Sequence, residues 1–531
     1  MNDKIEVAHV EEHKADTEAT GATIELLRDG NVVLQPPPTA DPNDPLNLPQ
    51  WRKWMILLLV SAYSCTAVVL ASGLGPIYSM IQASYPEAGN KTNDLLTYPT
   101  LLMGIGNLIS MPLAMVVGRR PVFLVSMVAL VLGGLWCALS TSLVSHIAGR
   151  NIMSLAAGQS EALAPMMIQE VFFLHEKGRK LGWFIFIQNA TSGAFFIMST
   201  YLVAAYGWKW WYGLFTIINA VLLLVSYVFV TETSYPNRAD MQHAPRMQSP
   251  EDSLDHPKDG NAGTVAPPTV ASRPVLDAET FGPRTWKGDL RLLCRVRNWH
   301  ILPTFYLQVV QGLCVPSILW LLLLNGAFLG IYVFMASTFS GILLAPPYLL
   351  SFEALGYVQA GQIVVCLIFL PLLGYGSDWV IRFMSRHNNG AFKPEYRLLL
   401  LWIPSIVGVV CTIIYGQVGK SPEKWSTAAP IFTYNASFFA FVGANVVGIT
   451  YAVDSFPARA EAFLVVICAG RGIISFGLSY ATLPSIEAIG YNGALNIQGG
   501  IAAGLASLAI VFYVFGPRLR VYTNSVLGLS V

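Results

Sequence analysis

Two charged side chains interrupt the most apolar parts of this sequence, where a charge is costly. Glu161 and Arg471 each lie near the middle of a stretch long enough to cross a lipid bilayer. A charge at that depth costs about 2.5–3.5 kcal/mol on insertion scales, so it usually serves a transport pathway or a pairing. We therefore expect Glu161 to bind a cationic substrate or a proton, or else to pair with Arg150 or polar neighbours and fasten helices.

Arg471 has a similar range of roles. We expect it to act as the counter-ion of Glu161, to anchor an anionic group, or to donate hydrogen bonds to the backbone of a neighbouring helix. Amide side chains in the same apolar stretches complete the predicted site for substrate or protons, although amides there also serve only to hold helices together. The predicted members are Gln159, Gln188, Asn189, Asn325 and Asn445. Glycines predicted to allow close helix approach include Gly104 and Gly472.

A second group of charges lies near the ends of the apolar stretches and suits a conformational latch between two arrangements of the helices. Its predicted members are Arg119, Arg120, Glu170, Glu176, Arg179, Asp378 and Arg382. Asp378 and Arg382 are four residues apart, which places them one turn apart on a helix. The alternative for Glu176 and Arg179 is a solvated charged loop.

Other classes of function lack their signatures. Neither H-E-x-x-H nor G-x-S-x-G occurs, and Ile414 stands where a phosphate-binding loop ending at Lys420-Ser421 needs its leading glycine. None of the seven cysteines forms a C-x-x-C pair, which argues against a zinc site or a disulfide framework. A net charge of +1 argues against a nucleic-acid partner. We expect no enzyme, no cofactor and no metal.

The elements that hold these residues must be membrane-spanning helices. Hydrophobic residues make up 54% of the chain and charged residues only 12%, about half the charged fraction of a soluble domain. Windows of about 20 apolar residues predict twelve spans in two sets of six, and hence an all-α membrane protein. The spans are 54–76, 95–117, 121–143, 147–171, 181–204, 211–231, 317–341, 356–376, 398–418, 429–452, 462–484 and 493–515.

Polar segments divide the chain into parts. We predict a disordered N-terminus over 1–53, helical bundles over 54–231 and 299–516, a mostly disordered central loop over 232–298, and a tail over 517–531. The second bundle is expected to open with a short interfacial helix.

Lysine and arginine set the predicted orientation. They concentrate in the short loops on the side of both termini, which places the termini and the central loop in the cytoplasm. Asn90-Lys91-Thr92 fits the N-glycosylation pattern and falls in an outer loop.

Short motifs occur along the chain in a characteristic order. They are Asp41 to Lys53, Gly118 to Pro121, Arg150 to Gly158, Phe173 to Gly178, Gly207 to Trp210, Glu232 to Tyr235, Pro394 to Leu398 and Tyr451 to Ser455. In this order they resemble the major facilitator superfamily, and within it the fungal drug:proton antiporter-type group, over roughly residues 41–520. The resemblance implies the major facilitator fold of 12 transmembrane helices in two pseudo-symmetric six-helix bundles.

The same resemblance implies a secondary active transporter that moves a small organic molecule by alternating access. Efflux of a drug, toxin or secondary metabolite coupled to protons is typical of the group. Met115 replaces an acid of the family's loop motif, and Phe195-Phe196 stands where antiporters have Gly-Pro. These departures keep uptake of organic cations such as polyamines open, and a non-transporting membrane sensor is a further alternative. The implied partners are substrate, protons and the lipid bilayer, with a monomer in the plasma membrane.

Overall fold

The computed structural model describes residues 27–28, 31–32, 39–235, 277, 279, 282–291, 299–387, 393–456 and 459–526. In these ranges, 11 helices are long and apolar enough to cross a membrane. The predicted fourth span is not among them because it is divided into shorter pieces. With that divided span, the described residues contain twelve segments at the places of the predicted spans, in a helical membrane fold.

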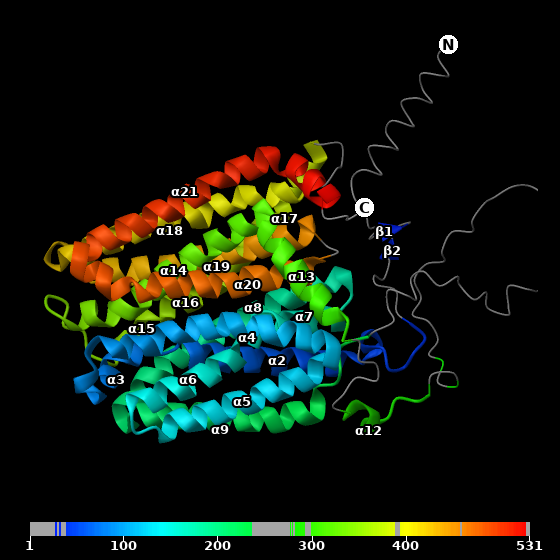
Figure 1. Cartoon of the computed structure of the whole chain (residues 1–531), viewed down its shortest axis with the longest axis horizontal. Coiled ribbons are helices and arrows are strands. Elements are labelled where there is room, and N and C mark those ends of the chain that lie inside the picture. The colour runs from blue at the N-terminus through cyan, green and yellow to red at the C-terminus, as the bar shows by residue number, and fades with distance from the viewer. Residues whose placement is uncertain are drawn as a thin grey trace, which may run out of the picture.

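The helices form two halves that lie one above the other in Figure 1. The first half comprises α2 (Gln50–Ser72), α3 (Tyr78–Ser84), α4 (Asp94–Val117), α5 (Arg119–Leu139), α6 (Leu143–Ala157), α7 (Leu163–Val171), α8 (Leu174–Tyr206) and α9 (Trp208–Phe229). The second half comprises α14 (Pro316–Leu344), α15 (Ala354–Val358), α16 (Ala360–Val364), α17 (Leu370–His387), α18 (Leu398–Lys420), α19 (Ala428–Ser455), α20 (Ala460–Tyr480) and α21 (Thr482–Val526).

Shorter elements connect and flank the halves. Between them lie α12 (Trp286–Asp289) and α13 (Ile301–Cys314). The 3-10 turns are η1 (Pro45–Asn47), η2 (Gly75–Ile77), η3 (Pro86–Asn93), η4 (Gly158–Ser160), η7 (Pro394–Arg397) and η8 (Pro422–Lys424), and a π-helical turn, η6, spans Val365–Phe369. Two-residue strands, β1 (Leu27–Arg28) and β2 (Asn31–Val32), pair antiparallel.

The prediction of one continuous fourth span over 147–171 is wrong. Helix α6 ends at Ala157, η4 follows, and α7 begins only at Leu163. Pro165 explains the break, because its ring nitrogen cannot donate a hydrogen bond to the carbonyl of Glu161 four residues earlier. Gly158 lets the break pack tightly, since a Cβ there would lie 2.3 Å from the carbonyl oxygen of Met103 in α4.

The described parts of the segments predicted to be disordered, or mostly disordered, contain short helical elements. Residues 39–53 contain η1 and the first turn of α2, and residues 282–291 contain α12. The last helix also continues past the predicted end at 515, reaching Val526, with a bend at Gly490, whose φ is 72°. The short pieces 27–28, 31–32, 232–235, 277 and 279 are also described, and the rest of the predicted disordered segments lies outside the described residues.

The helices of both halves end at two opposite faces of the molecule. We call the end that carries residues 39–53 and α12 the linker face, and the opposite end the far face (Figure 1). At the far face the halves are joined by a 2.6 Å hydrogen bond from the Tyr201 hydroxyl of α8 to the Tyr357 hydroxyl of α15. The Thr200 hydroxyl adds a 3.5 Å bond to the Glu353 carbonyl. Asn90 lies in η3, and its side chain falls outside the described part of the chain.

Along their length the halves meet where α4 crosses α20. A Cβ on Gly104 would lie 2.7 Å from the carbonyl oxygen of Ala469, and one on Gly472 would lie 2.7 Å from that of Thr100. The predicted role of these two glycines in close helix approach is therefore confirmed.

The close crossing of α4 and α20 predicts that a larger residue at Gly104 destabilises the protein. We expect Gly104→Ala to destabilise the protein by about 1–3 kcal/mol, because backbone atoms must shift to admit the methyl group. Gly477→Ala, in α20 with nothing within 4 Å of its Cβ, is the matched control. The control should keep or raise the melting temperature because alanine favours helix by about 1 kcal/mol. Thermal melting of the detergent-purified variants measures both, and equal melting temperatures would contradict the tight crossing.

Candidate functional site

A cluster of four polar side chains lies at the break in the fourth span. Glu161 Oε1 is 2.7 Å from Arg471 Nη2 of α20. Arg471 Nη1 donates to Asn445 Oδ1 of α19 at 2.6 Å. Asn107 Nδ2 of α4 donates to Glu161 Oε2 at 3.3 Å. We call Asn107, Glu161, Asn445 and Arg471 the central cluster; its ion pair joins the two halves.

The surroundings of the central cluster suit an accessible charge pair. The Arg471 side chain is only 5% exposed, whereas that of Glu161 is 19% exposed. The Arg471 guanidinium also lies 5.7 Å from the centre of the Phe441 ring, one turn before Asn445 on α19. Solvent therefore reaches the acid more readily than the base, and a cation or proton can approach Glu161 while Arg471 stays held by α19 and α20.

The break itself positions the acid. Glu161 follows η4 directly, and its backbone N–H donates to the Gly158 carbonyl at 3.1 Å. Discontinuous helices of this kind line substrate and ion sites near the bilayer midplane in many transporters. A charge near unwound backbone can therefore meet a polar ligand as well as its protein partner.

Arg150 does not pair with Glu161, which removes one of the alternatives for that acid. Its guanidinium is fully buried. It donates to the carbonyls of Leu95, Leu70 and Ala71 at 2.9, 3.1 and 2.7 Å. Arg150 thus holds the end of α2 against α4 and α6.

The other predicted amides lie apart from these contacts. Gln159 donates to the Val122 carbonyl of α5 at 3.3 Å. Asn189 and Asn325 donate to the carbonyls four residues earlier in their own helices, Ile185 and Leu321, at 2.8 and 2.9 Å. Gln188 lies beside Asn189 on α8 and is half-buried. A role in binding stays a prediction for these residues and for the central cluster.

The charges at the linker face form a second network. Arg119 Nη2 is 2.9 Å from Glu170 Oε1, and the Thr233 hydroxyl donates to Glu170 Oε2 at 2.7 Å. Glu232 accepts from the backbone N–H groups of Arg119 and Arg120 at 2.9 and 3.2 Å. All these residues belong to the first half or directly follow it, so this network fastens one half.

One charge of the second half acts on this network. Glu461, in the first turn of α20, attracts Arg119 electrostatically across the two halves. Glu176 is half-buried and Arg179 is exposed at the start of α8. Asp378 and Arg382 lie in α17, and their side chains fall outside the described residues. The predicted latch role of this group is not tested by these contacts.

The second half contains a matching ion pair. Arg397, the last residue of η7 and directly before α18, lies 2.5 Å from Asp454 near the end of α19. Arg119 and Glu170 occupy the corresponding places at the start of α5 and near the end of α7. The two pairs therefore mark equivalent positions in the two halves.

Two residues of the central cluster, Glu161 and Asn445, also occupy equivalent positions in the two halves. Glu161 lies nine residues before Glu170, and Asn445 lies nine residues before Asp454. Arg471 thus contacts a carboxylate from one half and, at the equivalent position of the other half, an uncharged amide. The cluster carries one positive and one negative charge.

The ion pair between Arg119 and Glu170 at the linker face is expected to stabilise the protein. We expect Arg119→Gln and Glu170→Gln each to lower the melting temperature, and the double variant to lose less than their sum by about 0.5–3 kcal/mol. The reason is that each single change leaves a buried partner uncompensated. Thermal melting of all four proteins completes the cycle. Additive losses would mean that the two side chains do not interact.

Several residues of these networks were missed from sequence. Asn107 lies in the middle of the second predicted span and carries the same signal as Asn445, a polar side chain at depth. Arg397, Asp454 and Glu232 belong to the short motifs named above, but their sequence context did not predict a contact for them. Their partners are far away in the chain, so local spacing could not pair them.

Comparison with known proteins identifies the family to which the chain belongs. The family model described as Major Facilitator Superfamily matches residues 54–467. The chain belongs to the major facilitator superfamily. An uncharacterized MFS-type transporter of Schizosaccharomyces pombe is 24% identical over 538 residues, covering 94% of this chain and 90% of that protein. The MFS-type transporter atr4 of Stereocaulon alpinum is 24% identical over 499 residues, covering 93% and 82%.

Solved structures of this superfamily share the fold. The xylose transporter XylE from E. coli, in a partially occluded inward open conformation, has a TM-score of 0.56 at 14% identity, covering 87% of this chain and 98% of that chain. A POT family transporter in complex with a thioalcohol conjugated peptide has a TM-score of 0.59 at 12% identity, covering 90% and 99%. At this identity the likeness concerns the fold alone. The chain is a multi-pass membrane transporter of this superfamily, and the two relatives named above are fungal.

Proposed function

We propose that this facilitator moves a small organic molecule by alternating access around the central cluster, and that it exports a drug, toxin or secondary metabolite. The observation that carries the proposal is the ion pair between Glu161 and Arg471, which joins the halves at the divided span. Rocking of the halves would move the two partners of this bond relative to each other. A ligand that replaces one partner can therefore couple its own binding to that motion.

Proton coupling forms part of the proposal. Protonation of Glu161 would remove the negative partner of Arg471 and release the contact between the halves. Support comes from the 19% exposure of the Glu161 side chain, which gives a proton access. A solved relative in fold, XylE, is described as a proton:xylose symporter, with a TM-score of 0.54 and 13% identity.

We further propose that the linker face lies in the cytoplasm and that the protein works as a monomer in the plasma membrane. The loops at this face carry most of the lysine and arginine of the short connections, as the positive-inside rule requires. Asp378 and Arg382 would then belong, with Arg119, Glu170 and Glu176, to a cytoplasmic latch.

Uptake of organic cations such as polyamines is the second candidate. The observation that favours it is α8, which has Phe195-Phe196 and no proline where antiporters of the group have Gly-Pro.

Purified protein in proteoliposomes with an imposed pH gradient tests the proposal. Ethidium serves as a planar drug-like cation and spermidine as a polyamine. Ethidium movement against its gradient, driven by protons moving the other way, supports export. Spermidine movement along with protons supports uptake. Gradient-independent fluxes equal to those of empty vesicles would contradict both.

A further inference from the structure

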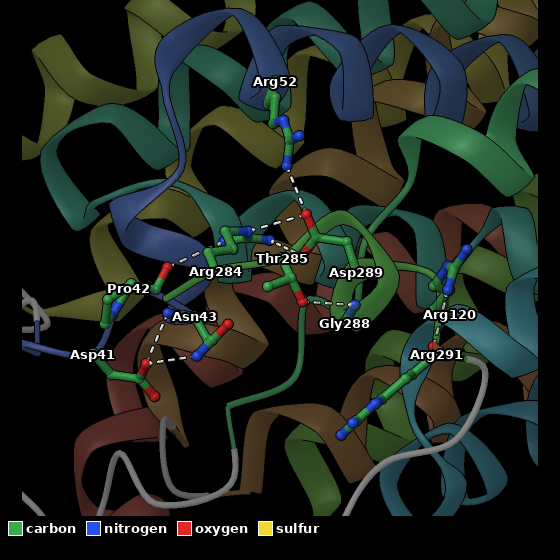
Figure 2. A network of polar contacts seen from close by, with 10 residues as sticks. All are labelled: Asp41, Pro42, Asn43, Arg52, Arg120, Arg284, Thr285, Gly288, Asp289 and Arg291. Carbon is green, nitrogen blue, oxygen red and sulfur yellow. Dashed lines mark hydrogen bonds and ion pairs between the residues drawn. The ribbon is translucent and has the colours of Figure 1, made fainter. Parts of the chain in front are cut away.

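The end of the central loop docks on the first half, although its composition predicts disorder (Figure 2). Four contacts fix it, at Asp277 and within residues 282–291. The Asp277 N–H donates to the Ala40 carbonyl at 2.9 Å, and Arg284 Nη1 donates to the Pro42 carbonyl at 3.4 Å. Asp289 pairs with Arg52, and the Arg291 carbonyl accepts from Arg120 Nη1 at 2.9 Å.

Asp289 is the centre of this contact. Its Oδ2 lies 2.7 Å from Arg52 Nη1, and its Oδ1 lies 2.8 Å from Arg284 Nη2. Arg284 Nε adds a bond to Oδ2 at 3.1 Å, so the Arg284 pairing is bidentate. The Asp289 side chain is only 11% exposed. Bidentate and partly buried pairs are stronger than exposed single contacts, so this carboxylate holds the loop to α2.

The receiving surface is the ordered part of the N-terminus. Asp44 accepts from the Leu46 N–H at 2.9 Å and from the Thr39 hydroxyl at 2.9 Å, which fixes η1. The buried Lys53 ammonium donates to the Leu46 carbonyl at 2.9 Å. The sequence motif of residues 41–53 therefore builds a platform on which the loop rests.

The other end of the first half joins the same platform. The Tyr235 hydroxyl, just after α9, donates to Asp41 Oδ2 at 3.1 Å. Burial raises the pKa of Tyr235, so the hydroxyl keeps the proton that it donates. The chain thus leaves the first half at the platform and returns to it at Asp277.

Docking changes how the halves are connected. Only seven residues separate Arg291 from Trp299, where the described chain resumes before α13. A fully extended chain rises about 3.5 Å per residue, so eight steps reach about 28 Å. The 64 steps from Tyr235 to Trp299 would otherwise reach roughly 220 Å. The docked segment makes a long loop act as a short tether.

Helix α13 passes this restraint to both halves. It packs against α14 and α20 of the second half and against α4 of the first. Its Tyr306 hydroxyl donates to the Leu108 carbonyl of α4 at 3.3 Å. A pull on the chain before α13 therefore acts at the seam between the halves.

We propose that Asp277 and residues 282–291 form a clasp, held by Asp289 on the platform, that limits how far the two halves separate at the linker face. The clasp is independent of substrate, direction and proton coupling. Releasing it lengthens the connection without touching the central cluster.

Distances between spin labels test the clasp. Trp183→Cys in α8 and Phe383→Cys in α17 provide label sites that are each 46% exposed. Cys294 and Cys314 are changed to serine, and the other five cysteines are buried. Double electron–electron resonance then gives the distance distribution across the halves. We expect Asp289→Ala and Arg52→Ala to add a population at longer distances, and the control Glu279→Ala, an exposed acid of the same segment, to leave it unchanged.

Insertions keep the test valid if the point variants fold poorly, because they leave every clasp contact in place. A Gly-Ser insertion within 292–298 should add longer distances, whereas the same insertion within 250–260, before the clasp, should not. Wild-type distributions with Asp289→Ala and with the later insertion would overturn the proposal. So would equal shifts from the two insertions, since the whole loop would then be the tether.

Discussion

Glu161→Gln should reduce transport in proteoliposomes to the level of empty vesicles while the protein still reaches the membrane. Glutamine can accept a hydrogen bond from Arg471 but cannot carry the charge or the exchangeable proton. The control is Glu423→Gln, which removes an exposed carboxylate at the far face, in η8. Transport by Glu161→Gln at the wild-type rate would contradict the placement of the site at the central cluster.

Stability must be separated from function in this test. Removing one partner of a buried ion pair costs about 3–5 kcal/mol because the other charge is left uncompensated. Glu161→Gln and Arg471→Gln should therefore each lower the melting temperature. The double variant removes both charges and should recover most of that loss while still failing to transport. Recovery of transport in the double variant would mean that the pair only fastens helices.

Asn445→Asp should shift the transporter towards cations. The change gives the second half an acid at the position equivalent to Glu161, so the net charge of the central cluster falls from zero to −1. Two unit charges about 4 Å apart interact by about 4 kcal/mol at an effective dielectric constant of 20. A tenfold fall in KM for ethidium needs only about 1.4 kcal/mol, so we expect at least that change.

The control for this variant is Gln417→Glu, which adds an acid to α18 at the far face, where Gln417 donates to Asn492. Its KM should match wild type. Asn445→Ala removes the amide without adding charge and separates the two effects. An unchanged KM for ethidium in Asn445→Asp would mean that cations do not approach Arg471 and its partners.

Hydropathy alone was enough to predict most of the membrane spans, whereas the arrangement in two pseudo-symmetric bundles came from the family resemblance. The spans follow from apolar runs of sufficient length, and Glu161 and Arg471 stand out because charges are rare in them. The break in the fourth span was missed because Gly158 and Pro165 lie within an apolar run, and a hydropathy window averages over them. Proline in a membrane helix either bends or divides it, and the close contact of Gly158 with α4 depends on a part of the chain far from Pro165 in sequence.

Partners far apart in the chain could not be predicted. Arg52 and Asp289 are separated by 237 positions, and each lies in a polar segment whose composition predicts disorder. The order of these segments comes from charge pairing and backbone contacts with each other, which no local pattern records. The Arg471 contact with Asn445 has the same character, since both were predicted as site residues but their meeting depends on how α19 packs against α20.

The docked segment has a consequence for dividing the gene. A cut within 240–270 yields a first piece that contains the platform and a second piece that has Asp277 and residues 282–291 near its start. The second piece then carries a segment that binds the first piece. Co-expressed pieces should reassemble through Asp289 and Arg52 as well as through the crossing of α4 and α20. A cut within 292–298 leaves the docked segment and the platform on the same piece. The piece with the second bundle then lacks this contact with the first.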